Sequence, residues 1–190
     1  MYIKKKFINI RKIIFSIIIL NSILIFSQNY PSRYGMKGGW NYSNIDAVDN
    51  LGEKSGYISG IIDEVYVSMF LEKQISQKSY LQSGLLFSYT ESVNFIELPL
   101  FYKYNFYKNF SFLIGPKIEY IPDKQYNNFY YFKNRFGLSA NLGIDYSLSK
   151  KWTIEGYYSR AFVKQFDQLI LEYYNSKRNV YRIGISYYFN

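Results

Sequence analysis

Apolar and polar residues alternate one by one through much of this sequence, which restricts its fold more than any other feature does. Between residues 96 and 106 every even position is apolar or aromatic, while Glu97, Lys103 and Asn105 stand at odd positions. Residues 135–148 and 181–189 repeat this alternation. Successive side chains of a strand point to opposite faces. Each stretch therefore predicts a β-strand that lies between two different environments.

Five further stretches bring the expected number of strands to eight. Residues 34–42 and 110–120 alternate clearly, whereas 81–89, 152–162 and a segment between 57 and 71 do so more weakly. The adjacent acids Asp63 and Glu64 interrupt the last of these. Short connections are expected at 72–78, 107–109 and 149–151, and longer ones at 44–56, 122–134 and 164–177, with 91–94 a short exception. Short and long connections that alternate along the chain predict an all-β fold, a closed antiparallel barrel whose two ends differ.

The first residues have the pattern of an export sequence. Five basic residues and no acid occur in residues 1–12, and residues 13–26 are apolar except for Ser16, Asn21 and Ser22. This run is shorter than the ~20 apolar residues of a spanning helix, and it has the proportions of a secretory signal peptide. We therefore expect a cleaved signal peptide at 1–27 and a barrel domain at 28–190. An uncleaved signal anchor is the alternative.

Removal of that segment changes the charge argument. The full chain carries 23 basic and 14 acidic residues, a net charge of +9, but five of the basic residues lie in the segment that is removed. The remaining net charge of +4 is ordinary for an exported protein. We therefore expect no nucleic-acid partner.

The composition of the two strand faces indicates what surrounds the barrel. A soluble barrel fills its interior with large apolar side chains, whereas a membrane barrel turns them toward lipid. Here the apolar face carries aromatic residues near strand ends, as lipid-interface girdles do, and the other face is rich in glycine. The charges expected inside are Lys37, Glu97, Lys103, Lys117, Glu119, Arg135, Asp145, Glu155 and Arg182. We predict a transmembrane β-barrel in the outer membrane of a Gram-negative bacterium. A soluble periplasmic barrel that binds an apolar ligand is the alternative.

Three segments carry a family resemblance. Residues 35–44 (GMKGGWNYSN) resemble the first strand of the porin-like, PorT-type outer-membrane β-barrel domain common in Bacteroidetes. Residues 96–104 (IELPLFYKY) are similar to its central strand, and residues 181–189 (YRIGISYYF) to its last strand, although Asn190 follows the final aromatic residue. The resemblance covers residues 33–189. It implies a fold and a compartment, with outer-membrane lipid and the barrel assembly machinery as partners, and it implies no activity.

The sequence contains no His and no Cys, which bears on catalysis. Known outer-membrane enzymes need an imidazole to move a proton near neutral pH. We therefore expect a protein that is not an enzyme, with no catalytic residue, no cofactor and no metal site. The interior charges either select solutes along a water-filled path or pair with one another to fill the lumen. Eight strands enclose a narrow space, which favours filling.

The expected function is therefore structural or based on surface recognition by extracellular loops, with a largely plugged lumen. A small porin, or an accessory of outer-membrane transport or protein secretion, is the alternative. Asp46, Asp49 and Glu53 lack the ligand spacing of a calcium loop. Lys124, Lys133 and Arg135 either contact lipid phosphates or form a solvated edge. An aromatic segment either binds a partner or glycan or belongs to the outer girdle: Tyr126, Phe129, Tyr130, Tyr131 and Phe132. The sequence does not identify the partner of the loops.

Overall fold

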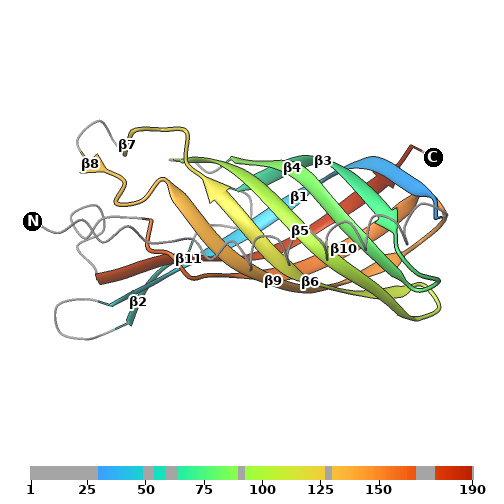
Figure 1. Cartoon of the computed structure of the whole chain (residues 1–190). Coiled ribbons are helices and arrows are strands. Elements are labelled where there is room, and N and C mark those ends of the chain that lie inside the picture. The colour runs from blue at the N-terminus through green and yellow to red at the C-terminus, as the bar shows by residue number, and fades with distance from the viewer. Residues whose placement is uncertain are drawn as a thin grey trace, which may run out of the picture.

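The computed structural model describes residues 30–48, 54–58, 64–89, 93–126, 130–165 and 174–189. Eight long strands form the wall of a barrel (Figure 1). The first two in chain order are β1 (Ser32–Val48) and β3 (Val65–Gln74). The others are β4 (Ser79–Tyr89), β5 (Asn94–Tyr107), β6 (Phe110–Tyr120), β9 (Phe136–Ser147), β10 (Trp152–Ala161) and β11 (Tyr174–Tyr188). In this part of the chain no helix is long and apolar enough to cross a membrane.

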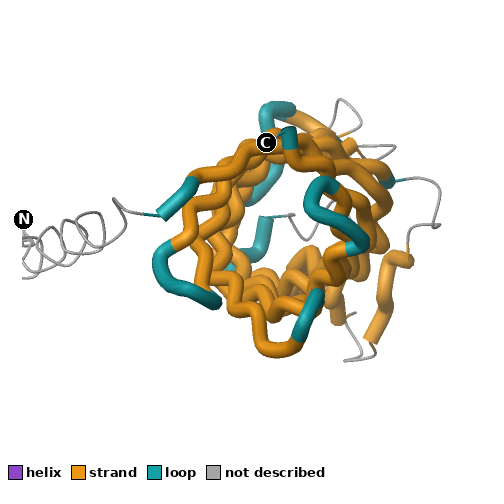
Figure 2. The backbone as a smooth tube through the Cα atoms, turned by 90° about the vertical axis from the view of Figure 1, so that its right-hand side faces the viewer, coloured by secondary structure: helices purple, strands orange, loops and turns teal. Residues whose placement is uncertain are grey.

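The sheet closes on itself. Neighbouring wall strands pair antiparallel, and β11 pairs with β1 from Gly35 opposite Tyr188 to Val48 opposite Tyr174. A view along the axis shows the resulting ring (Figure 2). The prediction of an eight-stranded antiparallel barrel is therefore confirmed.

A glycine permits the close approach of the two strands that close the barrel. A Cβ atom on Gly39 of β1 would lie 2.1 Å from the carbonyl oxygen of Ile183 and 2.5 Å from the Cα of Gly184, both on β11. Any larger residue would therefore collide with the backbone of the partner strand.

The wall beside β1 is built from two segments. β3 pairs with Ser32–Trp40, whereas the short β2 (Lys54–Ile58) pairs with Asn44–Val48. Between them the backbone N–H of Asn41 donates to the carbonyl oxygen of Glu64 over 3.0 Å. The weak strand expected between 57 and 71 thus begins at Val65 after the acidic pair, and it extends to Gln74. The assignment of residues 72–74 to a turn was wrong.

The two ends of the barrel differ. At one end, which we call the turn end, residues 75–78, 108–109 and 148–151 join consecutive strands, and the C-terminus lies there too (Figure 1). The connections at the opposite loop end are longer, except that between β4 and β5. One of them contains a two-residue hairpin, β7 (Gln125–Tyr126) and β8 (Tyr130–Tyr131).

The distribution of side chains is the inverse of that in a water-soluble protein. Leu100, Leu142 and Ile183 face outward in mid-wall and remain 46–59% exposed. Glu97 and Lys117 face inward and are fully buried. Folding alone does not remove these outward apolar side chains from solvent. The wall is therefore suited to an apolar medium that surrounds it.

Candidate functional site: the charged interior of the barrel

The inward face of the wall holds a set of ion pairs with equal numbers of each sign. Its basic members are Arg33, Lys37, Lys103, Lys117, Arg178 and Arg182, and its acidic members are Glu64, Glu72, Glu97, Glu119, Asp145 and Glu155. All are buried except Arg33, whose side chain is 34% exposed. Burial of a charge is costly unless an opposite charge and hydrogen bonds compensate it. The equal numbers of the two signs meet the charge part of that requirement.

Glu97 is the centre of the half nearer the loop end. Arg182 donates two hydrogen bonds to its carboxylate, over 3.0 and 2.9 Å. The ammonium of Lys117 lies 2.8 Å away, and the guanidinium of Arg178 lies 3.6 Å away. Arg182 also donates to the hydroxyl of Tyr157 over 2.8 Å. Three cations therefore share one carboxylate, and its geometry with Arg182 is bidentate, the strongest form of such a contact.

Two more carboxylates compensate the remaining charge around Glu97. Lys117 lies 3.0 Å from Glu119, which also accepts a hydrogen bond from Ser139. Arg178 lies 3.0 Å from Glu64, and the Ser43 hydroxyl donates to Glu64 over 2.5 Å. The cluster thus contains three cations and three anions.

A second group occupies the middle of the barrel. The Lys37 ammonium lies 3.1 Å from Glu155 and donates to the side-chain oxygen of Gln82 over 3.1 Å. The Tyr66 hydroxyl donates to Glu155 over 3.0 Å. The Lys37 ammonium also lies 5.4 Å from the ring centroid of Phe101. The ammonium is thus close to an aromatic ring, which is a favourable position for a cation.

The third group lies toward the turn end. Lys103 bridges Asp145 at 2.7 Å and Glu72 at 3.2 Å. Glu72 also pairs with Arg33, and it accepts hydrogen bonds from Tyr188 over 3.0 Å and from Gln82 over 3.1 Å. Because Gln82 contacts both Lys37 and Glu72, the middle group and the turn-end group form one network.

The structure brings together eight of the nine charges that the sequence suggested for the interior, namely Lys37, Glu97, Lys103, Lys117, Glu119, Asp145, Glu155 and Arg182. Arg135 lies apart from them. It is half-buried at the loop end, where it donates to the carbonyl oxygens of Ile121 and Pro122, over 2.9 and 2.5 Å, and to the Tyr120 hydroxyl. The expectation that Arg135 belongs to the interior charges was therefore wrong. Its position lies before the first residue of β9, Phe136, so the alternation of that strand does not direct its side chain.

Sequence reasoning missed four members of the network, namely Arg33, Glu64, Glu72 and Arg178. Glu72 was placed in a connection and Arg178 was left between a connection and the last strand, yet both continue the alternation of a strand. Glu72 follows Tyr66, Ser68 and Phe70 on the inward face of β3, and Arg178 precedes Val180 and Arg182 on that of β11. Extension of each alternating pattern until it failed would have found both.

The aromatic segment near the loop end is described only in part. Phe132 is buried, with 8% of the residue exposed. The other members of this segment lie outside the residues whose side chains the structure describes, as do Asp46, Asp49 and Glu53. Among the described residues, no group of three or more His, Cys, Asp or Glu could hold a metal ion.

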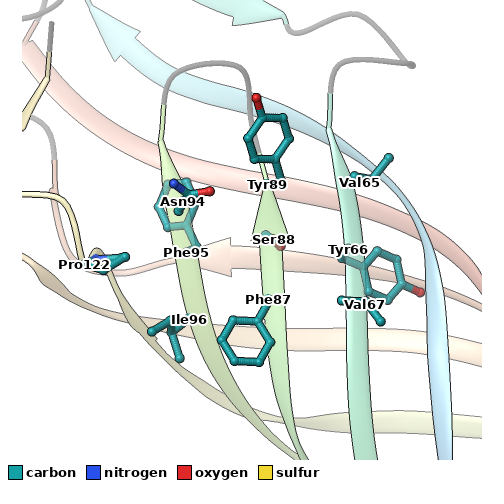
Figure 3. A pocket seen from close by; sticks show the side chains of 10 residues that line it. All are labelled: Val65, Tyr66, Val67, Phe87, Ser88, Tyr89, Asn94, Phe95, Ile96 and Pro122. Atoms are coloured by element: carbon teal, nitrogen blue, oxygen red, sulfur yellow. The ribbon is translucent and has the colours of Figure 1, made fainter.

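A pocket of about 420 Å³ lies on the outer wall near the loop end (Figure 3). Val65, Val67, Phe87, Tyr89 and Ile96 contribute outward-facing side chains from β3, β4 and β5. None of the ten lining residues is charged, so the pocket offers an apolar surface and no reactive group.

A closed antiparallel barrel with an apolar outer wall and a charged interior defines the class of transmembrane outer-membrane barrels. The outer membrane protein beta-barrel domain model matches residues 13–189. The chain belongs to that family and is a protein of the bacterial outer membrane. In such barrels the short turns are periplasmic and the longer loops extracellular, which assigns the turn end to the periplasm and the loop end to the outside.

The comparison with solved structures found other barrels that are similar to this chain. Neisserial surface protein A is similar with a TM-score of 0.52 and 8% identity, covering 81% of this chain and 96% of its own. The Ail attachment invasion locus protein of Yersinia pestis has a TM-score of 0.49 and 10% identity, covering 83% and 99%. OprG of Pseudomonas aeruginosa has a TM-score of 0.45 and 14% identity, covering 85% and 97%. No curated protein sequence matches this chain.

Proposed function

We propose that this protein is a closed-lumen outer-membrane barrel with a structural or surface-recognition role, which it performs through its extracellular loops. The supporting observation is the contact between Glu97 and Arg182. Glu97 belongs to β5 and Arg182 to β11, and four strand-to-strand steps separate them in either direction around the ring. They are therefore diametrically opposed. Two hydrogen bonds of 3.0 and 2.9 Å across that diameter support a closed lumen at this level.

Bilayer conductance tests this proposal. The wild-type protein in a planar bilayer should give no discrete current steps, because the cross-lumen contact blocks the passage. The double variant Glu97→Ser/Arg182→Ser removes both side chains of that contact and should show openings. Lys150→Ser changes an exposed turn and should behave like the wild type. Reproducible steps from the wild-type protein would refute the closed lumen and support the alternative, a small porin or an accessory of transport or protein secretion.

We also propose that the protein has no enzymatic activity. The absence of His and Cys from the sequence supports this, as does the engagement of each interior carboxylate in an ion pair, which leaves none available as a general acid or base. Incubation of the purified barrel with lipopolysaccharide, phospholipid or peptide, followed by mass spectrometry of the products, tests the point. A product that depends on the folded barrel would contradict it.

The relation to PorT-type barrels of Bacteroidetes is part of the same proposal. The three segments that carry the resemblance lie in β1, β5 and β11, which include the two strands that close the barrel. The barrel assembly machinery and outer-membrane lipid would then be its partners during biogenesis. Export by a cleaved signal peptide at 1–27, a segment outside the described residues, is tested by sequencing the N-terminus of the protein from washed outer membranes.

A further inference from the structure

The periplasmic end of the barrel carries a ring of lysines. Lys78 lies in the turn between β3 and β4, Lys108 in that between β5 and β6, and Lys150 and Lys151 in that between β9 and β10. All four are exposed, and Lys73 at the end of β3 is half-exposed. We call these five residues the lysine collar. Among the described residues of this end, the acids Glu72 and Asp145 are both buried within the ion-pair network.

Among the described residues of the turn end, no exposed acid balances the charge of the collar. The ion pairs of the interior compensate one another completely. At the opposite end, the described residues include an acid that is not part of the interior network, Asp123, along with the lysines. The positive charge of the barrel domain is therefore concentrated at its periplasmic rim.

Two members of the collar lie beside aromatic rings of the outer wall. The Lys108 ammonium is 5.2 Å from the ring centroid of Tyr107, and the Lys151 ammonium is 6.0 Å from that of Tyr187. Tyr107 is 56% exposed, and the ring of Tyr187 packs against that of Trp152 with a centroid separation of 4.7 Å. Such aromatic belts lie at the level of the lipid headgroups. These two ammoniums thus lie at the level of the headgroups.

We propose that the lysine collar binds the phosphate groups of anionic phospholipids in the inner leaflet of the outer membrane. Ammonium groups at this level replace part of their hydration with lipid phosphate. Because the described residues of the rim include no exposed acid, that attraction is not cancelled. Binding of a soluble acidic partner in the periplasm would instead require lysines that point along the barrel axis. The lateral position beside Tyr107 and Tyr187 favours the membrane.

The protein contains a reporter for this contact. Of its two tryptophans, Trp152 lies next to Lys151, and Trp40 faces outward from the more distant part of β1. In a Trp40→Phe background, Trp152 is the sole fluorophore. The barrel is reconstituted into phosphatidylcholine vesicles that contain an equal, small mole fraction of brominated phosphatidylcholine or of brominated phosphatidylglycerol. Quenching of Trp152 then measures which lipid occupies the collar.

We expect the apparent affinity for brominated phosphatidylglycerol to exceed that for brominated phosphatidylcholine about fivefold, the factor of one lysine near an anionic surface. The preference should disappear in Lys108→Gln/Lys150→Gln/Lys151→Gln and in concentrated salt. The matched control, Lys124→Gln/Lys133→Gln/Lys164→Gln, removes three exposed lysines at the loop end, and it should retain the preference.

Equal quenching by the two lipids in the wild-type background would overturn the proposal, and an acidic protein or a cell-wall polymer would become the better partner. A preference that survives in the collar variant, or that the loop-end variant loses to the same extent, would overturn it as well. Migration of unboiled protein in SDS gels verifies that each variant is folded. If the triple variant fails to fold, the salt dependence of the wild-type preference still decides the question.

Discussion

Replacement of Glu97 by Gln tests whether the interior is dry. The substitution keeps the shape of the side chain and removes the one charge that Arg182, Lys117 and Arg178 share, at 2.8–3.6 Å. A balanced interior would become cationic by one unit. Removal of one partner from a buried ion pair costs about 3–5 kcal/mol, whereas a solvated pair contributes about 0–1 kcal/mol. The free energy of unfolding should therefore fall by about 3–5 kcal/mol in the variant.

The measurement is urea unfolding of the barrel in phospholipid vesicles, followed by tryptophan fluorescence and by the fast-migrating band in unboiled SDS gels. Asp123→Asn is the matched control, because it removes one negative charge at the rim and keeps an oxygen that accepts from the Asn94 N–H. It should change stability by less than about 0.5 kcal/mol. A loss below about 1 kcal/mol for Glu97→Gln would mean that water screens these charges, and the argument for a tightly filled lumen would be wrong.

Three other predictions concern the seam, the outer wall and the middle of the barrel. Gly39→Val should abolish the fast-migrating folded band, because a Cβ there lies 2.1 Å from a β11 carbonyl oxygen. Gly156→Val should keep the band, because the nearest atom to a Cβ at that position is 3.8 Å away. Leu100→Lys in mid-wall should destabilise the barrel in urea unfolding by about 2–4 kcal/mol, but Tyr89→Lys near the outer rim by only about 0–1 kcal/mol. Equal costs would argue against the lipid-facing assignment. Tyr66→Phe removes the hydrogen bond to Glu155 and should cost about 1 kcal/mol by the same assay, with the outward Tyr181→Phe as the neutral control.

Much of this fold was predictable because lipid and lumen impose opposite demands on neighbouring residues. The alternation that includes Leu98, Leu100 and Tyr102 identified both the strand and its outward face, and the same pattern identified Glu97 and Lys103 as inward. The second wall strand was less certain because it consists of two pieces. β2 and β3 follow β1 in succession, and the adjacent acids before Val65 break the period between them.

Which charge pairs with which was not predictable. Glu97 and Arg182 are 85 residues apart, and the strand pattern says only that both point inward. Their contact depends on the ring position of β5 and β11 and on the stagger of the strands, which the register of the whole wall determines together. Arg135 was misplaced for a related reason. It is a basic residue that continues the alternating pattern, but it lies just before the start of β9 and donates to nearby backbone carbonyl groups instead of joining the interior ion pairs.

The cross-lumen contact also has a consequence for assembly. Closure of the barrel requires the first and last strands to find each other in one register, and backbone pairing alone tolerates a slip of two residues, which keeps the same side chains inward. A slip of two along β11 would move Arg182 and Arg178 out of level with Glu97 and bring Gly184 or Val180 in their place. The buried carboxylate would then lack its bidentate partner. The interior charges therefore distinguish the correct closure of the barrel from its nearest errors, a task that the uniform lipid-facing wall cannot perform.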